Sequence, residues 1–182
     1  ARLGAAPGDL ALTDVLALLR NDPHLRDINR HVRQKPVTEV ERPAAARLVL
    51  GTAQFGQAYG ISNTRGQVAA AEVRAILARA AQAGVGLLDT AANYGEAEQV
   101  LSQLDTRPFR IVSKTIGVAH GIDAVVARAR DSARLLGGLD LLLVHAASDL
   151  LGRGGDAVWS ALRGLKDEGV TRGIGISAYV AD

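Results

Sequence analysis

From residue 47 onward, short apolar runs alternate with stretches of helical periodicity, and this alternation constrains the fold more than any other feature. Strands are predicted at residues 47–50, 86–89, 109–113, 139–144 and 173–177. The first intervening stretch has one helix face made of Val73, Ile76, Leu77 and Ala80. Strands that alternate with helices pair in parallel through right-handed crossovers. The predicted fold class is therefore α/β with a parallel sheet.

Polar residues stand where the predicted strands end, and they favour one kind of parallel sheet. They are Thr52, Asp89, Lys114, His145 and Ser177. Ligands bind at the carboxyl ends of parallel strands, and in a barrel these ends converge on one axis. An open doubly wound sheet usually has a G-x-G-x-x-G loop after its first strand, whereas residues 51–56 here are GTAQFG. We therefore predict a partial (β/α)8 TIM barrel comprising its first five parallel strands.

The residues before the alternation have a different character. Residues 1–35 predict two short helices, and residues 36–46 contain two prolines without periodicity, as is typical of a linker. We expect a helical tail of an upstream domain at 1–35, a linker at 36–46 and an incomplete barrel at 47–182. The chain starts with Ala1 and ends at Asp182, directly after the fifth predicted strand. These ends predict a fragment of a longer polypeptide.

Composition excludes several classes of function. The apolar share of 48% predicts a packed core, and a net charge of +2 with interspersed bases predicts no nucleic-acid partner. The absence of Cys excludes a disulfide framework, a Cys nucleophile and a thiolate metal site, and no His pair has metal-ligand spacing. No apolar run approaches the roughly 20 residues that span a bilayer. We expect a cytoplasmic protein without membrane contact or bound metal.

Four of the residue types near the strand ends suit one reaction together. A phenol is a poor acid at neutral pH unless a nearby cation stabilises its anion, and a carboxylate behind a Lys keeps that ammonium oriented. A His can bond the substrate oxygen. Such a group can protonate a carbonyl oxygen while a cofactor delivers a hydride to the carbon. A Tyr, a Lys, an Asp and a His thus favour carbonyl reduction.

Each of these residues also has an ordinary explanation when it is taken alone. Asp89 is then a helix cap, Tyr94 a packing residue and Lys114 a solvated strand terminus. His145 follows an apolar run and is equally consistent with a hydrogen-bonded core histidine. Their occurrence together, in this order along the chain, favours the catalytic interpretation.

Residues 84–95, GVGLLDTAANYG, followed by SKT at 113–115 and LLVH at 142–145, resemble the aldo-keto reductases. The pattern of that family is G-x-x-x-x-D-T-A-x-x-Y-G, then a Lys after the third strand and a His after the fourth. LGTAQFG at 50–56 is similar to the family's first-strand loop, and RGIGISAY at 172–179 to its G-x-S-N-Y strand. The resemblance covers residues 47–180 approximately.

The resemblance implies NADP-dependent reduction of an aldehyde or ketone. Tyr94 would be the proton donor, Lys114 and Asp89 would tune it, and His145 would orient the carbonyl. The family barrel has eight strands, so the resemblance also implies that the C-terminal half of the barrel needed for activity is missing. We expect the chain alone to be inactive.

The same resemblance supplies the candidates for cofactor binding. Ser177 would hold the nicotinamide amide, but Ala178 stands where the family has an Asn, so half of that contact does not carry over. Gly51 and Thr52, in the first-strand loop, are the other cofactor-binding candidates.

Residues 1–35 resemble, over a short helical stretch, the C-terminal tail of a spore-coat-polysaccharide-type cytidylyltransferase. This resemblance implies a cytidylyltransferase–reductase fusion in surface polysaccharide biosynthesis, with a sugar or sugar nucleotide as the carbonyl substrate. The alternative from a different class is a non-catalytic barrel fragment or binding subunit.

Overall fold

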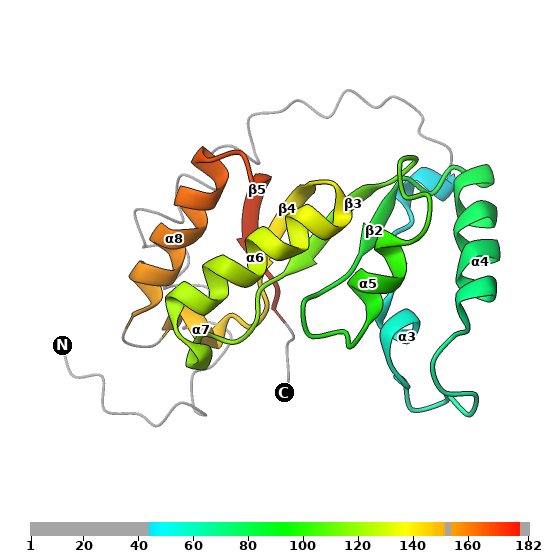
Figure 1. The fold of residues 1–182 in the computed structure, drawn as a ribbon, viewed down its shortest axis with the longest axis horizontal. Coiled ribbons are helices and arrows are strands. Elements are labelled where there is room, and N and C mark those ends of the chain that lie inside the picture. The colour runs from blue at the N-terminus through cyan, green and yellow to red at the C-terminus, as the bar shows by residue number, and fades with distance from the viewer. Residues whose placement is uncertain (1–43, 152–153, 179–182) are drawn as a thin grey trace. The chain divides into compact units, whose positions relative to one another are not determined.

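A five-stranded parallel sheet forms the centre of the computed structural model, which describes residues 44–151 and 154–178 (Figure 1). The strands are β1 (Leu50–Gly51), β2 (Leu87–Asp89), β3 (Arg110–Lys114), β4 (Leu139–Val144) and β5 (Thr171–Ile176). They lie in the order β1-β2-β3-β4-β5, and every neighbouring pair is parallel. The predicted parallel sheet is confirmed. The predicted tail at 1–35 lies outside the described residues, and its domain boundaries stay predictions.

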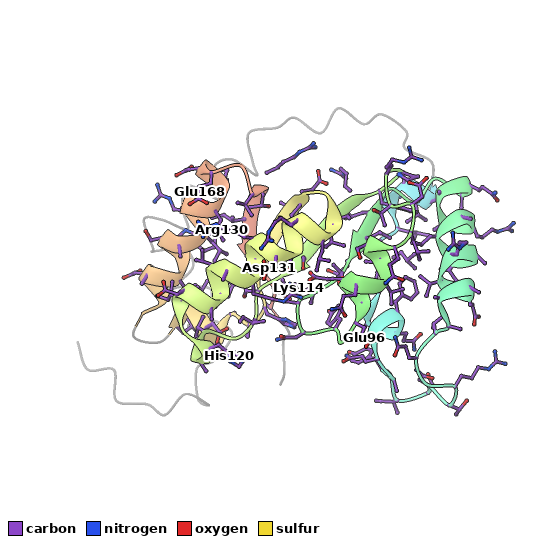
Figure 2. The ribbon with its side chains drawn as sticks, viewed as in Figure 1. Glu96, Lys114, His120, Arg130, Asp131 and Glu168 are labelled. Carbon is purple, nitrogen blue, oxygen red and sulfur yellow. The ribbon has the colours of Figure 1, made fainter. Side chains whose placement is uncertain are left out.

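A helix follows each of the first four strands, as the periodicity predicts. The long helices are α4 (Ala70–Gln82), α6 (Ile122–Leu136) and α8 (Gly155–Asp167), and a shorter α5 (Ala97–Ser102) follows β2. Four short turns were not predicted from the sequence: η1 (Ala44–Arg47), α3 (Ala53–Gly56), η2 (Val118–His120) and α7 (Ser148–Leu151). Helix α5 packs on α6 and α6 packs on α8, where Arg130 and Glu168 form a surface ion pair at 2.8 Å (Figure 2).

The first strand is shorter than predicted. We expected a strand at 47–50, but Arg47 ends the turn η1, and the strand consists of Leu50 and Gly51 alone. Leu48 and Val49 are 60% and 52% exposed, and the Leu48 amide bonds the Ala45 carbonyl inside the turn. The reason is that, among the residues that the structure describes, β1 pairs with β2 alone, so apolar residues there gain little from a longer strand.

The sheet has a helix-covered face and an inner face. Leu88, Leu142 and Val144 are at most 1% exposed and belong to the helix-covered face. Side chains point alternately to the two faces along a strand. Asp89 follows the helix-facing Leu88, and Lys114 follows Ser113, which pairs with the helix-facing Leu142. Asp89 and Lys114 therefore lie on the inner face. Both residues lie at the carboxyl ends of their strands, which is where the sequence predicts the ligand-binding site.

The inner face is open in the part of the chain that the structure describes. There, β1 pairs with β2 alone and β5 with β4 alone, so the sheet does not close on itself. Leu141 on the inner face of β4 is 39% exposed, and its side chain lies over the adjacent Gly173. Within the same residues, no helix is both long enough and apolar enough to cross a membrane.

Candidate active site

An ion pair joins the ends of β2 and β3. The Nζ atom of Lys114 donates to both carboxylate oxygens of Asp89 at 2.7 Å each, and to the carbonyl oxygen of Thr90 at 3.0 Å. The side chain of Lys114 is 7% exposed and that of Asp89 is 31% exposed. A buried ammonium is tolerated only when hydrogen-bond acceptors surround it. The same acceptors hold the ammonium of Lys114, which is labelled in Figure 2, in one position.

The same ammonium contacts the phenol of Tyr94. Lys114 Nζ donates to Tyr94 Oη at 3.1 Å and lies 4.7 Å from the centre of the ring. An ammonium has donors and no acceptor, so the phenol oxygen must accept this bond. The hydroxyl proton of Tyr94 is therefore not used by Lys114 and points elsewhere.

Two glycines allow the loop of Tyr94 to take its position. The amide of Glu96 donates to the carbonyl of Gly56 at 3.1 Å, which fastens the loop after β2 to helix α3. A Cβ atom on Gly56 would lie 1.9 Å from the carbonyl oxygen of Tyr94, and one on Gly95 would lie 2.3 Å from that of Gly56. Gly95 also has φ of +55°, which L side chains rarely adopt. The backbones touch directly at this crossing.

His145 completes the cluster from the end of β4. Its backbone amide donates to Thr115 Oγ1 at 3.2 Å, and its ring stands edge-on to that of Tyr94 at 6.0 Å between centroids. The buried Nδ1 atom of His145 has no hydrogen-bond partner among the described residues. A buried polar atom without a hydrogen-bond partner is costly, so this atom is an exception among buried polar groups. The structure thus brings Asp89, Tyr94, Lys114 and His145 together.

A hollow lies at the opposite end of the sheet. A cavity of about 950 Å³ is lined by residues at the N-terminal ends of three strands, among them Arg110, Leu139 and Arg172. None of the four clustered residues lines it. The chemistry-bearing groups all stand at the carboxyl ends, so this cavity is not the candidate active site.

Comparison with known proteins agrees with the motifs. The sequence profile of the Aldo/keto reductase family matches residues 47–182. The chain belongs to the aldo/keto reductase family. The resemblance carried by residues 84–95 and by Lys114 and His145 is thereby confirmed at the level of the family. A search of the curated proteins gave no significant match.

Solved aldo-keto reductases share the fold of this chain. A protein of Pseudomonas aeruginosa assigned to the aldo-keto reductases is 29% identical with a TM-score of 0.58, over 71% of this chain and 54% of its own. An aldo-keto reductase of Bacillus halodurans in its holo form (22% identity, TM-score 0.57) is matched over 72% and 45%. One of Bombyx mori in complex with NADP (23% identity, TM-score 0.53) is matched over 71% and 45%. This aldo/keto reductase chain spans about half the length of these structures, and the predicted partial (β/α)8 barrel is confirmed.

The three candidate cofactor residues take different positions. Thr52 is fully buried, and its hydroxyl donates to the carbonyl of Asp89 at 3.0 Å, so its proton serves to join β1 to β2. Gly51 is exposed, and a Cβ atom added there would have no other atom within 4 Å. The amide of Ser177 donates to Val144 at 2.9 Å, which places Ser177 beside the residue that precedes His145. Their roles toward a cofactor stay predictions.

Glu98 is a functional candidate that sequence reasoning missed. Apolar periodicity over residues 97–104 indicates a helix face of Ala97, Val100, Leu101 and Leu104, and a polar Glu98 is not part of that pattern. In the structure Glu98 is 2% exposed and fully hydrogen-bonded. The available signal was its spacing, because Glu98 stands three residues before the buried Leu101 and so shares its face of the helix.

Proposed function

We propose that this aldo/keto reductase chain carries the catalytic acid of an NADP-dependent oxidoreductase that reduces an aldehyde or a ketone, with Tyr94 as the proton donor. The observation that carries the proposal is the bond from Lys114 Nζ to Tyr94 Oη at 3.1 Å. That bond occupies a lone pair of the phenol and leaves its proton free for a substrate oxygen. The activity belongs to the family, and its assignment to these residues is ours.

The charges of the cluster suit a proton transfer of this kind. As the Tyr94 proton moves to the carbonyl oxygen, negative charge develops on Oη beside the ammonium of Lys114, which stabilises it. Asp89 holds that ammonium in place through two bonds of 2.7 Å. The imidazole of His145, whose ring stands beside that of Tyr94, would bond the carbonyl oxygen and orient it toward the phenol.

The residues present fit the reactive end of a nicotinamide cofactor. Lys114 and Asp89 form an ion pair with no net charge. The cluster therefore suits the uncharged nicotinamide ring of NADPH and the uncharged carbonyl group of a substrate. Ser177 and Gly51 would hold the cofactor, with Thr52 supporting Gly51 from its buried position, although Ala178 has no side-chain amide to assist Ser177. When bound, NADPH would supply the hydride.

Replacing the proposed acid tests the function. In the gene-encoded polypeptide, assayed with NADPH and a panel of aldehydes and ketones, Tyr94→Phe should lower kcat by about 100- to 10,000-fold, the usual contribution of a general acid. KM should change little, because the ring remains. Tyr59→Phe is the matched control, since Tyr59 is 57% exposed and should keep the parent rate. A Tyr94→Phe variant with full turnover would rule out the acid role.

The substrate class and the alternative function are tested by the same assay. The resemblance of residues 1–35 to a cytidylyltransferase tail leads us to propose a sugar or a sugar nucleotide as substrate, so kcat/KM should be higher for such carbonyls than for simple aldehydes. The open sheet favours the alternative of a non-catalytic binding subunit. NADPH binding without turnover of any carbonyl would support that alternative.

A further inference from the structure

A second buried polar cluster lies behind the candidate active site, on the helix-covered face of the sheet. Its centre is the carboxylate of Glu98, which is 2% exposed. Ser113 Oγ on β3 donates to Glu98 Oε1 at 2.6 Å. On α6, Ser132 Oγ donates to Glu98 Oε2 at 2.8 Å and the guanidinium of Arg128 donates to the same oxygen at 2.6 Å.

Because Glu98 is buried, its carboxylate depends on these hydrogen bonds. A carboxylate withdrawn from water is strongly destabilising unless donors replace its hydration, and removing one partner leaves the rest of a buried network unsatisfied. The three donors of Glu98 come from two elements, β3 and α6, while Glu98 itself belongs to α5. The carboxylate therefore ties α5 to β3 and to α6 at defined distances.

The tie to β3 leads directly to the candidate active site. Ser113 is the residue before Lys114, and the two side chains project to opposite faces of the same strand. Glu98 lies one helical turn after Tyr94, whose carbonyl accepts the bond from the Ala97 amide that begins α5. The Glu98–Ser113 bond thus links the segment that carries the phenol to the strand that carries the ammonium.

We infer that Glu98 is a positioning residue, which acts through Ser113 to hold Lys114 Nζ within hydrogen-bond distance of Tyr94 Oη. The inference rests on the proposed function and deepens it. The pair of Asp89 and Lys114 fixes β3 relative to β2, and bonds of Lys114 with Thr90 and Ala92 reach the start of the Tyr94 loop, but none of these bonds reaches α5 at its far end. Because α5 has six residues, its position depends on contacts with its neighbours, and the bond from Ser113 reaches the Lys114 strand directly.

Two serines on the same carboxylate provide a matched test. Ser113→Ala removes the bond from β3, and Ser132→Ala removes a bond from α6, which carries none of the four clustered residues. Ser113 and Ser132 are 0% and 1% exposed. Ser113→Ala loses one buried hydrogen bond, whereas Ser132→Ala loses two, because Ser132 Oγ also accepts from Arg128. We expect the loss of thermal stability to be at least as large in Ser132→Ala as in Ser113→Ala, whereas kcat should be about tenfold lower in Ser113→Ala and near the parent value in Ser132→Ala, with KM for NADPH unchanged in both. Equal losses of kcat would overturn the inference.

A second readout does not depend on enzymatic activity. The acylation rate of Lys114 by an amine-reactive reagent, measured by peptide mass spectrometry, reports how firmly its ammonium is held. Exposed Lys166 is the internal reference. Lys114 should react faster in Ser113→Ala and at the parent rate in Ser132→Ala. Equal rates would overturn the inference whether or not the protein reduces carbonyls, whereas a difference without turnover would reject only the proposed function.

Two variants at position 98 keep the inference testable if Ser113→Ala does not fold. Glu98→Gln keeps an oxygen that can accept from Ser113, while Glu98→Ala removes every acceptor. Lys114 should stay protected from acylation in Glu98→Gln and lose protection in Glu98→Ala. Loss of protection to the same degree in both variants would contradict the positioning role.

Discussion

At the scale of single residues, the direction of the Tyr94 proton follows from counting donors and acceptors. The ammonium of Lys114 can only donate, and the carboxylate of Asp89 can only accept while it is ionised. Lys114 Nζ reaches both oxygens of Asp89, the carbonyl of Thr90 and Oη of Tyr94, all within 3.1 Å. The phenol is therefore an acceptor toward Lys114, and its own proton is free for another acceptor.

Asp89→Asn tests the ion pair without disturbing the strands. The amide nitrogen of Asn would face the ammonium of Lys114, so a charge-assisted bond is lost and Lys114 is held less firmly. We expect kcat to fall by about 10- to 100-fold, the equivalent of one charged hydrogen bond. Thr52 bonds the backbone carbonyl at position 89, so that contact should persist. Steady-state kinetics with thermal unfolding measures both effects, and a change of kcat below about twofold would contradict the role.

A pH effect is expected at the opposite end of the sheet. Hydrogen bonds from the Arg107 side chain, and then from its backbone amide, lower the pKa of Asp105 from 3.8 to about 2. Because this pKa is lower in the folded state, the pair contributes stability above pH 3.8 and loses it as the pH falls toward 2. Both side chains are exposed, so solvent weakens the contribution.

Substitution of Arg107 separates the two causes. In Arg107→Ala, the carboxyl pKa of Asp105 should rise toward 3.8 without reaching it, because the backbone bond at 3.2 Å remains. An NMR titration of the Asp105 side-chain carboxyl carbon measures the change. An unaltered titration would show that the side chain of Arg107 is not the principal cause.

At the scale of elements, the crossing of α3 and the Tyr94 loop admits no side chain. Gly56→Ala would bring a Cβ to 1.9 Å from the carbonyl of Tyr94 and 2.2 Å from the amide of Ala97, so the loop must move. We expect a loss on the order of 3 kcal/mol in the free energy of unfolding, as in severe overpacking, together with a lower kcat. Denaturant unfolding and steady-state kinetics measure both.

The matched control is a glycine in the middle of a helix. Gly164 lies within α8 and has no atom within 4 Å of an added Cβ. Gly164→Ala should raise the free energy of unfolding by about 0.5–1 kcal/mol, because Ala has less conformational freedom to lose in a helix. A gain at Gly164 and a loss at Gly56 would show that space, and not glycine flexibility alone, determines the outcome.

At the scale of the whole molecule, the open sheet has consequences in solution. Strands β1 and β5 each present an unpaired edge in the described part of the chain, and Leu141 is 39% exposed on the inner face. Unpaired edges and apolar sheet faces promote association. We expect the 182-residue chain by itself to bind a hydrophobic fluorescent dye, to elute as associated species in size-exclusion chromatography, and to show little reductase activity. A monomeric chain with an ordinary turnover rate would contradict this.

Much of the barrel and of the candidate site was predictable from local sequence. Apolar runs that alternate with helical periodicity require a parallel sheet, and the carboxyl ends of its strands form one edge. Asp89, Lys114 and His145 stand at or directly after such ends, so their proximity followed once the strands were located. Tyr94, on the loop after β2, was linked to them by its spacing from Asp89.

Other features depended on contacts between residues distant in the chain. Glu98 is buried because Ser113, Arg128 and Ser132, at 15, 30 and 34 residues' separation, supply its donors. Gly56 is required because another backbone passes through the space of its side chain. Helical periodicity records which face of an element is apolar, not which partner will meet a polar residue on that face. The sequence by itself determined the order of the strands and the ends that carry the chemistry, while only the tertiary structure decided which buried charge is satisfied and where the Tyr94 proton can point.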